Sequence, residues 1–200
     1  MSTAEFPRSS GRRLRSALFI ALLSIGTTTY APAGHAACDV ETPDNYRLDH
    51  YRAPTPCDLP GAEIVDTQEL KELLANDAPI LIDAMPLVHT GETDFTGRWT
   101  VPKPRHNIPG SIWLPNIGQG SLDDEMSAYF QDNLRQVTAC DRHRPLVFYC
   151  FVDCWMSWNA AKRALEFGYD RVIWYPEGTD GWKDAGEPLA LSTPVPLFEE

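Results

Sequence analysis

Two cysteines at the end of an apolar run are the residues of this chain best suited to chemistry. Cys150 follows the run "PLVFY", and Cys154 lies four positions later, where the helical stretch "MSWNAAKRAL" begins. Backbone N–H groups at the start of a helix stabilise a thiolate, which is the nucleophilic form of cysteine. We therefore expect Cys150 to be a nucleophile with a lowered pKa, and the backbone amides of residues 151–155 to surround its charge.

The second cysteine leaves several interpretations open. A Cys150–Cys154 disulfide is allowed, although ideal helix geometry at this spacing lies near the upper distance limit. Cys154 would then act as the resolving thiol, which attacks a persulfide or mixed disulfide formed on Cys150. The two sulfurs, with Met156 or His106 as a further ligand, would also make a soft ligand set that suits Cu(I). Simple packing of a buried thiol is the remaining alternative. We expect no structural zinc, since the chain has no second Cys/His cluster.

The first 36 residues predict a secretion signal. Four arginines precede the apolar stretch "ALFIALLSIG", and the small residues of "APAGHAAC" suit a cleavage site. An uncleaved anchor is the alternative, but the apolar stretch is short for a membrane span. We expect a periplasmic protein with no stable membrane span after cleavage. In an oxidising compartment Cys38 and Cys57 would pair and fasten the N-terminal arm, while Cys140 would stay an unreactive thiol.

The charge of the chain argues against nucleic acid as a partner. The first 36 residues hold four of the 17 basic and one of the 28 acidic residues, which leaves 13 basic and 27 acidic and a net charge of −14. No basic stripe remains to bind phosphates or an anionic membrane surface.

Apolar runs and amphipathic stretches alternate along the chain, which predicts an α/β fold. We expect a signal peptide at 1–36, an ordered arm at 37–61, a domain at 62–190 and a tail at 191–200. Solid apolar strands separated by helices favour a parallel sheet flanked by helices on both faces. Ligands of such sheets bind beyond the carboxyl ends of the strands. Asp83 and Cys150 end two of the predicted strands and should meet at that edge.

Four segments together resemble the rhodanese-like domain. They are "PILIDAMP", "NIPGSIWLPN", "PLVFYC" and "AAKRALEFGYDRVIWYPEGTDGW", and they follow the family's order of a strand-ending aspartate, an Ile-Pro-Gly turn, a strand-ending cysteine and a Gly-rich close. The chain is more narrowly similar to the CXXCW motif proteins associated with pyrroloquinoline-quinone (PQQ)-dependent catabolism, through "YRAPTPCDLPGA", "FYCFVDCWMSWNAAKRAL" and "YPEGTDGW". The label of that family implies two residues between the cysteines, whereas this chain has three. The resemblance implies an exported protein that works beside periplasmic quinoprotein alcohol oxidation.

The resemblance also assigns roles to residues around the cysteines. Cys150 matches the nucleophile that carries sulfur as a persulfide, and the loop that follows normally holds glycine and arginine. Here the loop has lost that positive charge, which puts simple thiosulfate sulfurtransferase activity in doubt. Arg105 could replace the charge. His106 could act as a proton partner, but a solvated loop is the favoured interpretation of this residue. The remaining predicted site and loop residues are Phe151, Val152, Asp153, Trp155 and Asp83.

From these residues we expect an exported protein with a thiol-based active loop. Its function would be thiol–disulfide or sulfur-transfer chemistry linked to PQQ-dependent alcohol catabolism, with quinoprotein-pathway proteins as partners and no required cofactor. The alternative is a non-enzymatic module that binds copper or a redox cofactor, or that docks a partner protein.

Overall fold

The structure is a computed structural model that describes residues 1, 39–87 and 99–197. The predicted signal peptide beyond its first residue, Cys38, residues 88–98 and the last three residues of the predicted tail lie outside the described residues. Among the described residues, no helix is both long and apolar enough to cross a membrane.

A five-stranded sheet with the order β1-β6-β5-β2-β4 forms the centre of the fold, and every neighbouring pair in it is parallel. This confirms the predicted α/β architecture. In β5 all four residues are buried, because both faces of the sheet are covered by helices. The strands are β1 (Glu63–Ile64), β2 (Ile80–Asp83), β4 (Ile112–Trp113), β5 (Leu146–Tyr149) and β6 (Val172–Trp174).

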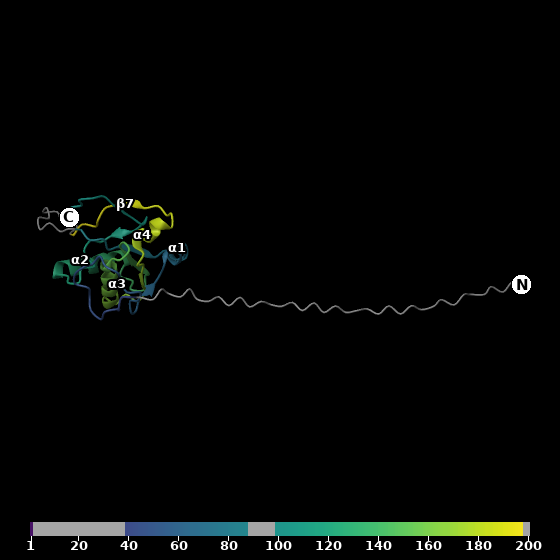
Figure 1. Cartoon of the computed structure of the whole chain (residues 1–200), viewed down its shortest axis with the longest axis horizontal. Coiled ribbons are helices and arrows are strands. Elements are labelled where there is room, and N and C mark those ends of the chain that lie inside the picture. The colour runs from purple at the N-terminus through teal and green to yellow at the C-terminus, as the bar shows by residue number, and fades with distance from the viewer. Residues whose placement is uncertain (2–38, 88–98, 198–200) are drawn as a thin grey trace. The chain divides into compact units, whose positions relative to one another are not determined.

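Four helices cover the two faces of the sheet (Figure 1). Apolar side chains of α2 (Asp124–Thr138) and α3 (Trp155–Glu166) pack with Phe148 and Trp174 in one buried cluster. Those of α1 (Thr67–Asn76) and α4 (Gly178–Asp184) pack with Val147 and Ile173 in the other. Since adjacent residues of a strand point to opposite faces, the solid apolar strands supply both clusters.

The helix starts follow local sequence signals. Asp66 caps α1, where its side chain accepts the N–H of Glu69 and the Glu69 side chain accepts the N–H of Asp66 in return. The side chain of Asp180, in the first turn of α4, accepts the N–H of Val152 and so ties this helix to the loop after β5.

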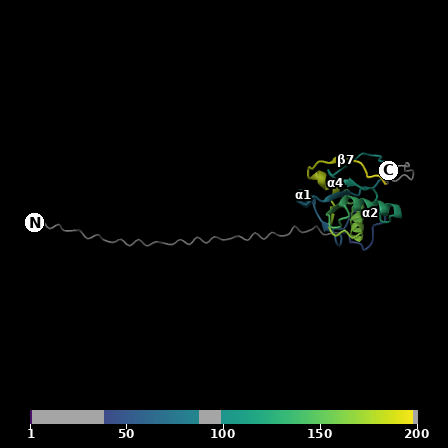
Figure 2. The ribbon, with the colours of Figure 1, turned by 180° about the vertical axis from the view of Figure 1, so that it is seen from behind.

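A second, two-stranded sheet was not predicted from the sequence. β3 (Arg105–Asn107) pairs in antiparallel fashion with β7 (Ala190–Ser192). This pairing joins the segment just before the Ile-Pro-Gly turn to the start of the predicted C-terminal tail. β7 runs along the top of the domain in Figure 1 and again in the reverse view of Figure 2. This pairing carries Arg105 to the carboxyl edge of the main sheet.

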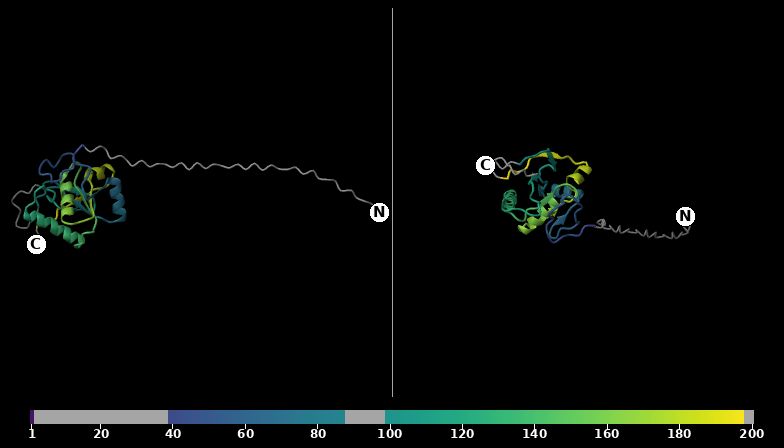
Figure 3. Two further views of the ribbon diagram at one scale, coloured as in Figure 1. Left: turned by 90° about the horizontal axis from the view of Figure 1, so that it is seen from below. Right: turned by 60° about the vertical axis from the view of Figure 1, so that its left-hand side comes forward.

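The N-terminal arm runs along α3, as the views of Figure 3 show. Asn159 on α3 accepts the N–H of Arg47 and donates to the carbonyl of the same residue. The indole N–H of Trp158 reaches the carbonyl of Asp58. Cys57 in the arm is disulfide-bonded, and its predicted partner Cys38 lies outside the described residues. The arm is thus an ordered part of the fold.

Candidate active site

The two thiols meet at the carboxyl edge of the sheet. Cys150 directly follows β5 and is fully buried, and Cys154 is the N-cap of α3 with 2% of its surface exposed. The link between them is not helical, because Asp153 adopts a left-handed conformation with φ of 57° and Cys154 is extended. This turn places Cys154 in the same buried cluster as Cys150. The distance limit of an ideal helix therefore does not apply to this pair.

The environments of the two thiols shift their pKa values in opposite directions. The pKa of Cys154 is lowered, first by the hydrogen bond from Cys150 and then by the backbone N–H groups of Met156, Ser157 and Phe151. The side chain of Cys154 makes no cap hydrogen bond at the start of α3. These amides therefore stabilise its thiolate mainly through their electrostatic field. Burial raises the pKa of Cys150, and the neighbouring Cys154 raises it further. The order is the reverse of the one we expected from the sequence.

Two of the backbone amides expected to surround Cys150 are engaged elsewhere. The N–H of Val152 donates to the carboxylate of Asp180, at 3.1 Å. The N–H of Trp155 donates to the carbonyl of Tyr51 in the arm, at 2.8 Å. The amide of Phe151 acts on Cys154 instead. The amides of Val152 and Trp155 are therefore not available to Cys150, and the helix start acts on Cys154.

The backbone of Cys150 is held by donors from two other elements. Its carbonyl oxygen accepts the N–H and the hydroxyl of Thr179, at 3.1 and 3.3 Å, and Nη2 of Arg105 at 3.2 Å. Gly178 makes this approach sterically feasible, because a Cβ there would lie 2.8 Å from the Cys150 oxygen and its φ of 55° disfavours other residues. The position of the thiol is thus fixed by α4 and β3 together.

Arg105 and Asp83 form a buried ion pair beside the thiols. Nε and Nη2 of Arg105 donate to the two carboxylate oxygens of Asp83, at 2.8 and 3.1 Å. Burial raises the pKa of Asp83 against the opposing effect of Arg105, while the pair raises the pKa of Arg105. We assign both groups as ionised, because two direct hydrogen bonds and the N–H of Met85 all stabilise the carboxylate. Arg105 lies near Cys150 as expected, but Asp83 neutralises most of its charge.

The structure does not bring His106 to the thiols. Its neighbours in β3, Arg105 and Asn107, point inward, and the alternation of a strand turns His106 to the opposite, exposed side. The expectation of a proton partner at this position is therefore not supported by the geometry, and the solvated alternative describes it.

The aromatic residues around the pair exclude water. The ring of Trp155 is 3% exposed, lies edge-on to Trp158 at 5.4 Å between ring centres, and donates its N–H to the carbonyl of Pro54. Phe151 is half-buried under the guanidinium of Arg52, 4.5 Å from its ring centre. Both side chains act as walls, and Val152 and Asp153 lie exposed outside them.

The arm closes the site from the other side. Tyr51 packs against the two cysteines, and the backbone of Arg52 forms a bridge with Cys154. Ala53 donates its N–H to the carbonyl of Asp153 at 3.1 Å. Reagents therefore reach the thiols only when this segment moves.

Sequence reasoning missed Met85 as a neighbour of the thiols. Its sulfur lies 3.7 Å from Sγ of Cys150. One signal was available, because Met85 follows Asp83 by two residues and must lie near the same sheet edge. Tyr51 carried no such signal, since its contacts depend on the path of the arm.

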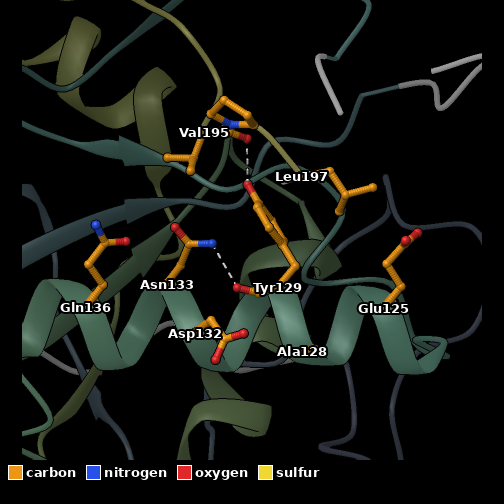
Figure 4. Close-up of a pocket in the computed structure, with 9 residues that line it drawn as sticks. Glu125, Ala128, Tyr129, Asp132, Asn133, Gln136, Val195 and Leu197 are labelled. Atoms are coloured by element: carbon orange, nitrogen blue, oxygen red, sulfur yellow. Dashed lines mark hydrogen bonds between the residues drawn. The ribbon is translucent and has the colours of Figure 1, made fainter. Parts of the chain in front are cut away.

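A pocket of about 440 Å³ lies elsewhere, along α2 (Figure 4). Its lining includes Glu125, Tyr129 and Asp132 of α2 together with Val195 and Leu197. The hydroxyl of Tyr129 donates to the carbonyl of Val195. The pocket contains neither cysteine nor histidine, so it offers space without a nucleophile.

Comparison with known families identifies the fold. The rhodanese-like domain matches residues 66–185, which is more than half of the chain. The chain belongs to the rhodanese-like domain family. The predicted family is thereby confirmed at this level, and both Asp83 and the cysteine pair fall within the matched region. No curated protein matches the chain.

Several solved structures share part of the fold. Wild-type EanB matches with 24% identity and a TM-score of 0.43, over 72% of this chain and 34% of its own. The anaerobic ergothioneine biosynthesis enzyme from Chlorobium limicola, in complex with trimethyl histidine, matches with 20% identity and a TM-score of 0.44, over 68% of this chain and 33% of its own. The chain thus spans about a third of the solved structures that it matches. Similarity at this level does not transfer an activity.

Proposed function

We propose that this protein is a dithiol–disulfide or sulfur-transfer protein in which Cys154 attacks and Cys150 resolves. The observation that carries this proposal is the pair itself, two buried thiols that lie in one cluster at the end of the sheet and whose pKa values are shifted in opposite directions. Membership in the rhodanese-like family fits sulfur or thiol chemistry in general. The family position alone favours Cys150 as the attacking thiol, so single-cysteine variants must decide the order.

In the first step the Cys154 thiolate attacks one sulfur of a disulfide. A new Cys154–substrate disulfide forms, the original sulfur–sulfur bond breaks, and the second half of the substrate leaves as a thiolate. With a persulfide donor, attack on the outer sulfur leaves a persulfide on Cys154 and releases the donor thiolate. The helix amides that lower the pKa of Cys154 keep the attacking thiolate populated.

In the second step Cys150 resolves the intermediate. Its thiol loses a proton to solvent, and the sulfur attacks Sγ of Cys154 to form the Cys150–Cys154 bond. The bound half leaves as a thiolate, or as hydrosulfide when Cys154 carries a persulfide. Two electrons pass from the protein dithiol to the substrate. Arg105 lowers the pKa of Cys150 slightly and holds its backbone during the attack.

The charge around the site is mixed. Arg105 is paired with Asp83, and the loop itself contributes the exposed Asp153. The exposed Arg52, whose guanidinium lies 4.5 Å from the centre of the Phe151 ring, is the cation that an anionic donor such as thiosulfate would meet at this loop. The chemistry proposed here uses disulfides or persulfides and does not need that cation.

We place this chemistry in an exported protein that supports PQQ-dependent alcohol catabolism. Support comes from the sequence: a basic and apolar start, and the likeness of "FYCFVDCWMSWNAAKRAL" to the CXXCW motif proteins. Fractionation of cells that produce the full chain tests export, because a mature protein shortened by about 36 residues should be found in the periplasm. A full-length protein in the cytoplasm would refute this setting and leave the thiol chemistry untouched.

The thiol chemistry is tested in a Cys140→Ser background, because Cys140 is an exposed free thiol that would react on its own. The protein is treated with oxidised glutathione and analysed by mass spectrometry. We expect a protein that has lost two hydrogens, with Cys150 linked to Cys154. Cys150→Ser should instead accumulate a glutathione adduct on Cys154.

Cys154→Ser separates the two orders of attack. We expect it to react far more slowly than Cys150→Ser, since only the thiol with the raised pKa remains. A stable adduct on Cys150 in Cys154→Ser, with none on Cys154 in Cys150→Ser, would reverse the roles. Two thiols that both stay free in the presence of oxidant would overturn the proposal.

A further inference from the structure

Four sulfur atoms of this chain gather at the end of the central sheet. Cys150, Cys154 and Met156 form one buried cluster, and the half-buried Met85 packs against it. The two thioethers come from different elements, since Met85 follows β2 and Met156 opens α3. A water-poor site that combines thiolates with thioethers suits soft monovalent metals rather than hard cations.

The spacing of the sulfurs fits a shared metal. Sγ of Cys150 lies 3.7 Å from Sδ of Met85, and Cys150 packs with Cys154 in one buried cluster. Metal–thiolate bonds are about 2.3 Å long, so two sulfurs on one trigonal or tetrahedral metal lie about 3.8–4.0 Å apart. Small shifts of flexible side chains would therefore complete such a site.

The charge around the sulfurs does not oppose a cation. The Asp83–Arg105 ion pair beside the site carries no net charge.

We propose that Cys150, Cys154 and Met85 bind Cu(I). The ion displaces the thiol protons to solvent and is held by two thiolates and one thioether, with no change in oxidation state. Met156 stands beside this set as a fourth sulfur. His106, the other ligand considered from the sequence, is exposed on the far side of β3 and takes no part.

Zinc fits the site less well. Zinc sites in proteins are tetrahedral and take most of their ligands from Cys, His, Asp and Glu. Within residues 39–87 and 99–197 no three such side chains gather in a way that could hold a metal. The site should therefore discriminate between Cu(I) and Zn²⁺.

This inference uses the same thiols as the proposed function, but the two stand or fall separately. Binding of Cu(I) requires Met85, whereas thiol–disulfide exchange does not. Met85→Leu removes the thioether and keeps an apolar side chain of similar size. Met126→Leu is the matched control, because Met126 is buried on α2 in the apolar cluster that α2 and α3 form, and not in the sulfur cluster.

The experiment is a competition for Cu(I) with the chromophoric chelator bicinchoninate, without oxygen and in the reduced Cys140→Ser protein. We expect one Cu(I) per chain. Met85→Leu should weaken the affinity by about 10–100-fold, the effect usual for a supporting group at a metal site. Met126→Leu should leave it unchanged, and Cys150→Ser should abolish tight binding.

X-ray absorption of the loaded protein gives an independent readout. We expect three sulfur neighbours at about 2.3 Å and the loss of one of them in Met85→Leu. Equal affinities of Met85→Leu and Met126→Leu would overturn the three-sulfur site, as would equal occupancy by Zn²⁺. Disulfide exchange with oxidised glutathione is measured separately on the Cys140→Ser protein without metal, so failure of the copper site does not imply failure of the thiol chemistry.

Discussion

Cys150 and Cys154 lie behind the arm with almost no exposed surface, whereas the pocket along α2 is open and holds no thiol. The open pocket and the buried thiols thus lie in different regions of this molecule. In the thiol site nearly every polar atom serves to hold a sulfur or its backbone. In the pocket, the hydroxyl of Tyr129 fastens the chain at Val195 and serves stability. A search for cavities alone would therefore point to the wrong region.

The sharpest difference between the regions should be in thiol reactivity. In the Cys140→Ser background, alkylation by iodoacetamide should depend on the Cys154 thiolate, whose pKa is lowered. The rate should be level above that pKa and fall as the pH drops through it, because protonation removes the nucleophile. Cys154→Ser should slow alkylation at neutral pH, since the thiol that remains is the one whose pKa burial raises. An identical pH profile in Cys150→Ser and Cys154→Ser would contradict the assignment.

The buried ion pair should matter more for stability than an exposed one. Arg105→Ala leaves the fully buried Asp83 without its partner, and should lower the free energy of unfolding by about 3–5 kcal/mol in urea titrations. The control Arg135→Ala removes the exposed pair with Asp132 on α2 and should change it by less than about 1 kcal/mol. Similar losses of unfolding free energy in Arg105→Ala and Arg135→Ala would show that the buried Asp83–Arg105 pair stabilises the protein no more than an exposed ion pair does.

Two tyrosines allow a matched test of the arm. The hydroxyl of Tyr51 accepts the N–H of Gly120 at 2.9 Å and donates to the carbonyl of Leu48 at 2.8 Å. Tyr51→Phe should loosen the arm by about 1 kcal/mol and so raise alkylation of Cys154 about fivefold. Tyr129→Phe should cost similar stability and leave alkylation unchanged. Equal alkylation rates in Tyr51→Phe and Tyr129→Phe would show that the arm does not control access to the thiols.

The smallest effect is expected from filling the open pocket. Ala128 is exposed on α2 and lines the pocket. Ala128→Lys should leave disulfide exchange and Cu(I) affinity within experimental error of the parent protein. A clear loss of either property would show that the pocket and the thiol site are coupled.

The fold could be predicted from sequence because its signals are local. The solid apolar run of residues 146–149 can be buried only in a sheet covered on both sides, and β5 is such a strand. Asp66 and Glu69 mark the start of α1 through contacts three residues apart. The β3–β7 sheet escaped prediction, because it pairs Arg105 with Ser192 across most of the domain and each strand has only three residues.

The candidate site was predicted in part for the same reason. The sequence by itself determined that Cys150 and Asp83 lie at the ends of two strands and that Cys154 stands at a helix start, since these follow from local patterns. Only the tertiary structure decided which thiol the helix amides stabilise, because the arm and α4 take the amides of Trp155 and Val152. Tertiary structure also decided that Met85 joins the thiols, since a contact over 65 residues depends on how strands are ordered and not on either strand's sequence.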